Sequence, residues 1–315
     1  MIYALLALWI ISALLILRER RIARIIIYLG IFSLISAVCY LLLGSPDVAM
    51  AEAATSIFST VFFIICFEKY FGYTDKQSDS SDLSYLAQKA KWLAPLFLTI
   101  ILFGLFVYFV PYGSGNDYLK VRYLTSFMQD VGGENAVTAI YLAYRVYDTL
   151  FEALVLVISV VAVIHLSAIE EATVRSGRHS EVESSGMAVF VIQIICPVML
   201  LFGIYLILNG HITPGGGFQG GLAIASFFVC RYMIYDIYDL PIDKLNRMEE
   251  IVFAGIVLLA GLIVFMGFDT YIPHAYQQIF QTAYLIVMNG LIGLKVACGF
   301  IILFYRYIAI ERERE

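Results

Sequence analysis

The sequence predicts an all-α integral membrane protein with about nine transmembrane helices, in three modules of three, two and four helices. Three observations support this fold class. Of the 315 residues, 61% are hydrophobic and only 14% are charged, whereas soluble proteins carry about 25% charged residues. The apolar residues gather in runs of about 20, the length that crosses a bilayer. No run alternates with the two-residue period of a barrel strand.

The apolar runs give the expected spans in order. They cover residues 2–17, 24–43, 47–71, 92–110, 148–166, 187–209, 217–237, 250–268 and 282–308. The first run is short and would need local thinning of the bilayer or snorkelling side chains. Ser45 and Pro46 supply an N-cap and a proline suited to the first helical position, so a helix is expected to begin there.

Basic residues predict how these spans are oriented. No basic residue precedes the first run, and Arg18, Arg20, Arg21 and Arg24 follow it. This pattern favours an uncleaved anchor over a signal peptide. With the amino end outside, most lysines and arginines fall in inner segments, so the carboxyl end is expected in the cytoplasm.

Two polar linkers, residues 72–91 and 168–186, separate the modules on one side of the membrane. The segment 111–147 between the fourth and fifth spans mixes glycines with amphipathic stretches, so it is expected to lie along the outer surface. The three expected modules are residues 1–85, 86–180 and 181–315.

A glycine-rich stretch, residues 209–221, lies between two long apolar runs. Its glycines are Gly210, Gly215, Gly216, Gly217, Gly220 and Gly221. A phosphate-binding loop is disfavoured, because no Gly-Lys-Ser/Thr follows and the stretch has no basic side chain. A tight hairpin is expected, in which the glycines let the two flanking helices pack closely. Alternatively, irregular backbone at this depth forms a docking surface or lines a cavity.

Acidic residues inside the third span are costly and therefore informative. Asp47 lies in the first helical turn, where the helix dipole favours a carboxylate, so it is either a capping residue or part of an ion path. Glu52 lies about 8 Å deeper among alanines that let another helix approach. It is expected to meet a partner or to exchange protons.

The fifth span carries Arg145, Asp148 and Glu152 at spacings of three and four, which place them on one helix face. Arg145 can neutralise Asp148, which leaves Glu152 one turn deeper with less compensation. Glu152 is therefore a candidate for proton exchange, and the alternative is a structural ion network with a neighbouring subunit.

Two further ionisable residues are candidates for an ion path. Lys295 is central in the last span, too deep to snorkel, and must find a carboxylate, carbonyl groups or water. His211 beside the glycine stretch is either a hydrogen-bonded structural residue or a proton relay. The five cysteines are isolated in apolar runs and the histidines lack ligand spacing, so no metal or cofactor is expected.

Residues 209–221 closely resemble the glycine-rich motif of the B subunit of Mrp-type cation/proton antiporters, and the similarity runs from about residue 187 to 307. Residues 44–54 are similar to a GAPD-x-A-x-x-E stretch of the small D-type component of membrane-bound hydrogenases, which recurs near the carboxyl end of the large A-type component of the antiporters. Residues 135–152 look like the E-like module that follows it there. The family usually has glycine before the acidic residue, where this chain has Phe151.

The resemblance implies a fused subunit in the order D-like, E-like, B-like, and with it a multisubunit complex. Implied partners are large antiporter-like subunits, small C-, F- and G-like subunits and, in a redox-driven complex, a hydrogenase or ferredoxin-oxidising arm. It also implies the cytoplasmic membrane of a bacterium or archaeon. Glu52 and Glu152 occupy the positions of carboxylates expected along or beside an ion path.

The leading hypothesis is a non-catalytic membrane subunit, not an enzyme, that contributes to sodium/proton exchange. Carboxylate oxygens can hold Na+ or a proton alternately. The alternative is a structural subunit that seals and docks antiporter-like subunits. A stand-alone transporter is disfavoured, since the three modules show no inverted repeat. The composition excludes a soluble enzyme or nucleic-acid binder.

Overall fold

The computed structural model describes residues 2–19, 21–71, 100–101, 104–105, 108, 118–166, 186–234, 241–266 and 274–309. All regular elements among them are helical, which confirms the predicted all-α class. They are α1 (Ile2–Arg18), α2 (Ile22–Leu42), α3 (Pro46–Phe71), α5 (Tyr118–Val131), α6 (Ala136–Ala139), the π-helical turn η1 (Ile140–Tyr144), α7 (Val146–Leu166), α8 (Gly186–Asn209), α9 (Gly217–Ile234), α10 (Ile242–Met266) and α11 (His274–Ala309).

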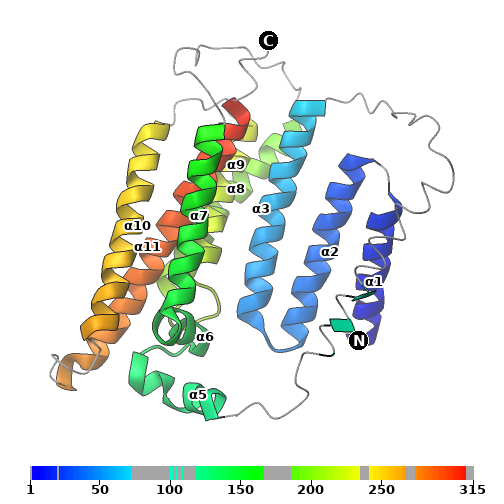
Figure 1. The fold of residues 1–315 in the computed structure, drawn as a ribbon. Helices are drawn as coiled ribbons and strands as arrows, with labels where there is room; N and C mark the ends of the chain where they lie inside the picture. Colours follow the sequence, from blue (N-terminus) through cyan, green and yellow to red (C-terminus); the bar gives the residue numbers. More distant parts are fainter. Residues whose placement is uncertain are drawn as a thin grey trace.

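The long helices lie side by side with roughly parallel axes (Figure 1). Helices α1, α2 and α3 form a row, because α2 packs against both of its neighbours. Helices α7 to α11 form a bundle in which α11 contacts the other four. Helix α3 joins the row to the bundle through its contacts with α9.

Helix α11 is the centre of the bundle. In its apolar window 61% of the residues are buried, compared with 17–22% in the other candidate spans. Leu285, Met288 and Phe304 on α11 are completely buried. The outer helices leave many large apolar side chains exposed, as expected of faces that contact lipid or other subunits.

Six of the described helices are long and apolar enough to cross a membrane, namely α2, α3, α7, α8, α10 and α11. Helix α1 is apolar but has 17 residues, and the 18-residue α9 is not among the six. The expected span 92–110 lies largely outside the described residues. The chain is therefore a multi-pass membrane protein, while the count of nine and the orientation remain predictions.

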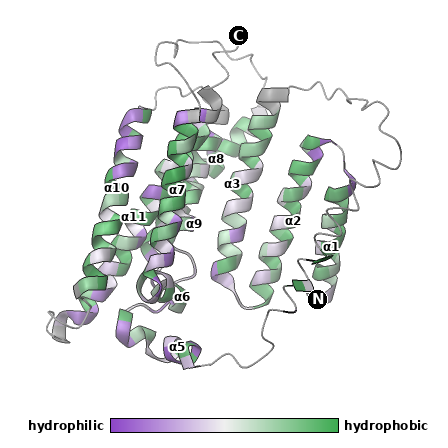
Figure 2. Cartoon of the chain, in the orientation of Figure 1, coloured by the Kyte–Doolittle hydropathy of each residue, from purple (hydrophilic) through white to green (hydrophobic). Residues whose placement is uncertain are grey.

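Hydropathy marks the embedded part of a helix better than its ends. Helix α3 begins at Pro46, as predicted. Helices α10 and α11, however, begin eight residues before the expected starts at 250 and 282. Their first turns are polar, which an α-helix tolerates outside hydrocarbon, so an apolar run underestimates helix length. Figure 2 shows hydrophilic residues at the start of α10 and on α5, and apolar residues along the long helices.

The connection between α5 and α7 is compact. Asn135 caps α6, because its side-chain oxygen accepts from the backbone N–H groups of Val137 and Thr138. Tyr144 in η1 donates a hydrogen bond of 2.7 Å to Asp130 on α5. Burial and this bond to a carboxylate raise the pKa of Tyr144 above its ordinary value, so its hydroxyl stays protonated. Helix α5 is thus fixed beneath the bundle, consistent with the predicted surface segment.

Candidate functional site

A cavity of about 270 Å³ lies where α7 faces α11. Helix α7 contributes one wall with the polar side chains of Thr149, Glu152 and Ser159. Helix α11 contributes Lys295, and α9 and α10 add only apolar side chains. The remaining lining residues are Ala153, Val155, Leu156, Phe218, Ile256, Ile292, Val296 and Phe300. The fold thus brings two of the predicted ionisable residues, Glu152 and Lys295, to one cavity.

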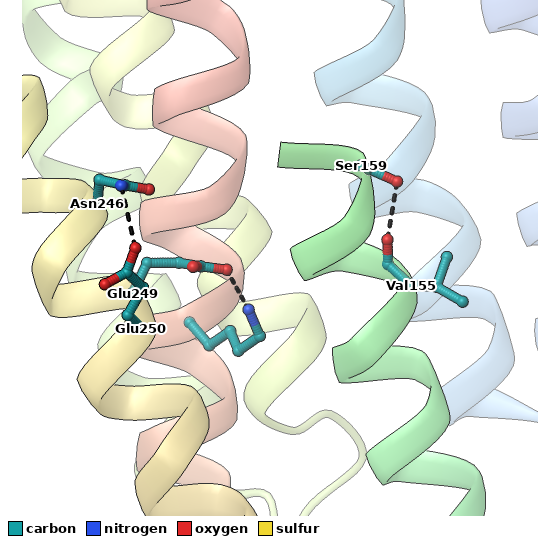
Figure 3. Close-up of polar contacts among 6 residues, drawn as sticks. Val155, Ser159, Asn246, Glu249 and Glu250 are labelled. Carbon is teal, nitrogen blue, oxygen red and sulfur yellow. Dashed lines mark hydrogen bonds and ion pairs between the residues drawn. The ribbon is translucent and has the colours of Figure 1, made fainter. Parts of the chain in front are cut away.

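Lys295 forms a buried ion pair with Glu249 of α10. Its Nζ donates a hydrogen bond to Glu249 Oε1, and the two side chains are only 1% and 2% exposed. Figure 3 shows Glu249 directed from α10 toward α11, whereas Glu250 bonds Asn246 along its own helix. The ring of Phe253 lies 5.2 Å from Nζ and adds a cation–π contact. Of the three partners expected for Lys295, a carboxylate, carbonyl groups or water, the structure therefore shows the carboxylate.

Unlike Lys295, Glu152 is exposed and has no charged partner among the described residues. Its side chain is exposed in the isolated chain, so the cavity opens to the surface beside it. Within the described residues no hydrogen bond or ion pair joins the Glu152 carboxylate. The preceding acid, Asp148, pairs with Arg145 at 2.5 Å as predicted, but both side chains are more than half exposed. In the fifth span, therefore, Arg145 neutralises the Asp148 carboxylate, whereas no described residue neutralises the Glu152 carboxylate.

Asp47 connects three parts of the chain. Its Oδ1 accepts from Asn135 Nδ2 at 3.1 Å and from the backbone N–H of Gly215 at 3.0 Å. Asn135 Nδ2 also lies within hydrogen-bonding distance of the Gly210 and Thr213 carbonyl oxygens. Asp47 is 9% exposed. Asp47 does not line the cavity; it ties α3 to α6 and to the glycine stretch.

Replacing Asp47 with asparagine is expected to lower the free energy of unfolding by about 1 kcal/mol, because two charge-assisted hydrogen bonds become neutral ones. Thermal unfolding of the purified complex in detergent would measure the loss. Thr55→Val serves as a control on the same helix, since the Thr55 hydroxyl bonds only its own helix backbone at Ala51. An unchanged midpoint for the Asp47 variant would contradict the bridging role.

His211 lies at the end of the same connection. Its backbone oxygen accepts from the N–H groups of Glu134 and Asn135 at 2.9 and 3.0 Å. Its ring Nδ1 lies 3.1 Å from the Leu208 carbonyl oxygen. His211 is not among the residues that line the cavity. The contacts that position it therefore match the structural interpretation, and its role as a relay remains a prediction.

The glycine stretch is a tight connection between α8 and α9, as predicted. A methyl group at Gly217 would lie 2.5 Å from the Asn289 carbonyl oxygen of α11, and one at Gly221 would lie 2.4 Å from that of Gly293. At Gly220 it would lie 2.6 Å from the Gly203 carbonyl oxygen on α8. The glycines thus allow α9 to approach both neighbouring helices. Gly217 N–H also donates to Asn289 Oδ1 at 3.0 Å.

Glu52 is half-buried between α2 and α3, where it accepts a hydrogen bond from Ser33. It therefore has the partner that was expected as one alternative. It does not line the cavity that holds Glu152. The structure does not bring the two predicted carboxylates to one site in this chain.

Sequence reasoning missed Glu249, because the expected span began one residue later. A usable signal was present, since Glu249, Phe253 and Ile256 recur at spacings of four and three and share one helix face. Glu249 and Ile256 are both buried. An acid on the apolar face of a helix predicts a basic partner, and Lys295 was the basic residue that still lacked one.

Two family models match the chain. Residues 187–302 match MnhB, a domain related to the MnhB subunit of Na+/H+ antiporter. Residues 7–70 match MbhD, the D component of MBH. The first match contains the glycine stretch and Lys295, and the second contains Asp47 and Glu52.

Curated proteins show the same similarities. An uncharacterized protein of Methanocaldococcus jannaschii is 30% identical over 193 residues, which cover 52% of this chain and 73% of that protein. A probable A/B-type component of a K(+)/H(+) antiporter of Rhizobium meliloti is 25% identical over 66% of this chain, but the match covers 23% of its length. A putative antiporter subunit mnhB2 of Staphylococcus haemolyticus is 39% identical over 24% of this chain and 57% of its own length. The chain therefore spans less than two thirds of the latter two relatives.

Two solved complexes contain similar chains. One chain of the Mrp complex from Dietzia sp. DQ12-45-1b matches 94% of this chain with a TM-score of 0.67 and 19% identity, over 34% of its own length, which is a likeness of fold. One chain of the membrane-bound sulfane sulfur reductase (MBS), an archaeal respiratory membrane complex, matches 68% of this chain with a TM-score of 0.55 and 28% identity, over 96% of its length.

Proposed function

The chain is a fused Mrp-type subunit with an MbhD domain and an MnhB-like domain, and from this premise we propose that it contributes directly to a sodium/proton path as a non-catalytic subunit. The complex is an Mrp-type Na+/H+ antiporter or an Mrp-like module of a complex-I-related hydrogenase or oxidoreductase. The relatives described as antiporter subunits support the first form, and the likeness to a respiratory membrane complex supports the second.

The observation that carries this proposal is the Glu152 carboxylate at the mouth of the cavity. It lies in an apolar span, and among the described residues nothing neutralises it. Such a group in a membrane must be covered by another subunit or by water, or must take up a cation or a proton. Na+ and H+ are therefore the proposed transported ions.

The proposed partners cover the exposed faces of the bundle. They are large antiporter-like subunits, small C-, F- and G-like subunits and, in a redox-driven complex, a hydrogenase or ferredoxin-oxidising arm. The proposed location is the cytoplasmic membrane of a bacterium or archaeon. Similarity to chains of two multisubunit membrane complexes supports this assignment.

The Glu152→Gln variant tests the proposal. Glutamine keeps the shape of the side chain but cannot exchange a proton or balance a cation. We expect exchange to fall by about 100-fold, the lower end of what a positioned proton-transferring group contributes. Sodium/proton exchange would be measured in vesicles that contain the assembled complex.

The matched control is Glu134→Gln, an exposed carboxylate of the same module that does not line the cavity. It should exchange ions at the wild-type rate. If Glu152→Gln also does so in a fully assembled complex, Glu152 has no part in transport.

A structural role is the second candidate, because the hydrogen bonds of Asp47 and the Glu249–Lys295 pair both hold separate helices together. It predicts that substitutions in these groups dissociate the complex before they alter exchange. Native gel electrophoresis of each variant, run beside the transport assay, separates the two candidates.

A further inference from the structure

We propose that the cavity between α7 and α11 carries a proton rather than Na+, and that this proton passes between Glu152 and the Glu249–Lys295 pair. The inference rests on the proposed function and deepens it by assigning the ion that uses this site. Three features of the structure support it: the ligands on the cavity wall, the buried pair, and the positions of the charged groups along the helices.

The cavity wall has too few oxygen atoms for a hard cation. Such cations are held by about six oxygen ligands in proteins. The side chains that line the cavity supply the Glu152 carboxylate and the hydroxyls of Thr149 and Ser159. These side chains supply four oxygen atoms, and the two hydroxyls are oriented by the hydrogen bonds that they donate to the carbonyl oxygens of Tyr141 and Val155, at 2.6 and 2.8 Å. Figure 3 shows the Ser159 bond along α7.

Lys295 makes the cavity still less suited to Na+. Its side chain lines the same cavity, and its ammonium group, which is paired with Glu249, has no lone pair to offer a cation. A proton needs only one acceptor at a time, and it can move along water molecules between acceptors. A cavity of about 270 Å³ with polar groups at its edge has room for several waters.

The buried pair can exist in two forms. Lys295 and Glu249 are an ammonium and a carboxylate, or, after one proton moves from Nζ to Oε1, an amine and a carboxylic acid. At 1–2% exposure the two charges have lost almost all of their hydration, a cost that the neutral form of the pair does not carry. The neutral amine of Lys295 can then accept a proton from the cavity side.

The transfer balances in three steps. Glu152 takes up a proton at the open mouth and becomes a carboxylic acid. Lys295 gives its proton to Glu249 and becomes an amine, which then receives the proton of Glu152 through cavity water. Glu249 finally releases its proton toward the start of α10, and all three groups return to their first state.

The two acids lie on helices that enter the bundle from opposite ends. Glu152 is about 9 Å from the start of α7, and Glu249 is about 10 Å from the start of α10. Helices α7 and α10 begin at opposite ends of the bundle in Figure 1. The cavity therefore lies on a route between them. Other titratable side chains near this route are Tyr141, within electrostatic range of Glu152, and Cys298, within range of the pair.

Lys295→Arg is the decisive variant. A guanidinium keeps the positive charge and the pairing with Glu249, but it does not release a proton at any working pH. We expect the complex to assemble and exchange to fall by about 100-fold. We expect the sodium concentration for half-maximal exchange to change by less than about twofold, since a site without Na+ contributes no sodium affinity.

For Glu249→Gln, which alters the partner of Lys295, we likewise expect exchange to fall by about 100-fold and the sodium concentration for half-maximal exchange to stay nearly unchanged. Its matched control is Glu250→Gln, since Glu250 is the next residue, is exposed and bonds Asn246 at the surface. That control should exchange ions at the wild-type rate. Wild-type exchange by Lys295→Arg, or a large loss of sodium affinity without loss of maximal rate, would overturn the inference.

Infrared difference spectra of the wild-type complex keep the inference testable if these variants do not assemble. A buried carboxyl band that appears as the pH falls is expected, and its absence would overturn the inference. Failure of the proposed function is a separate result, because it requires wild-type exchange by Glu152→Gln. Loss in Glu152→Gln combined with full exchange in Lys295→Arg overturns only the assignment of the proton route.

Discussion

Replacing Glu249 with leucine is expected to lower the free energy of unfolding by about 3–5 kcal/mol, the cost of leaving one partner of a buried ion pair alone. Lys295 is 1% exposed, and Glu249 accepts the hydrogen bond that its Nζ donates. The ring of Phe253 at 5.2 Å remains, but its cation–π contact is already present in the wild type and so does not offset the loss. Denaturant unfolding of the purified complex in detergent would measure the effect.

The double variant Glu249→Leu/Lys295→Met is the control for this prediction. It removes both charges and keeps the volume, so it should recover most of the lost stability. A double-mutant cycle with Lys295→Met alone gives the coupling between the two side chains. A loss below about 1 kcal/mol in Glu249→Leu would mean that water or another subunit already neutralises Lys295. A stable double variant that exchanges no ions would separate the structural role of the pair from its role in transport.

Much of the architecture could be predicted from local properties of the sequence. Apolar runs of membrane length predicted helices, and Pro46 predicted where α3 begins. The spacing of Arg145 and Asp148 predicted their ion pair, because three residues along a helix fix the distance between side chains. The density of glycines predicted close helix packing. A glycine has no Cβ and so lets any neighbouring helix approach, whichever helix that is.

The partners across helices could not be predicted in this way. Glu249 meets Lys295, and Asp47 meets Asn135 and Gly215, only after helices distant in the sequence have packed. Hydropathy placed Glu249 outside its span, because it measures the apolar run and not the helix that contains it. The sequence showed that Lys295 needed a carboxylate, carbonyl groups or water, but which of these it meets depends on the packing of α10 against α11.

The close approach of α9 to α11 gives the second large expected effect. Gly221→Ala should lower the free energy of unfolding by about 1–3 kcal/mol, because the added methyl group would lie 2.4 Å from the Gly293 carbonyl oxygen. A backbone oxygen in a helix cannot rotate away as a side chain can, so the two helices must separate. That movement also shifts Lys295, two residues after Gly293, and should therefore reduce ion exchange. Thermal unfolding and vesicle exchange of the same preparation would measure both effects.

The matched control is Gly261→Ala on α10, where an added methyl group meets no atom within 4 Å. This change should leave stability unaltered or raise it by up to about 1 kcal/mol, because alanine favours a helix more than glycine does. If both alanine variants behave alike, the approach of α9 to α11 is looser than the structure indicates. If only Gly221→Ala loses stability while exchange stays intact, the packing of these helices supports the fold but does not set the position of Lys295. A loss of both would mean that the same glycine contact holds the bundle together and positions Lys295 at the cavity wall.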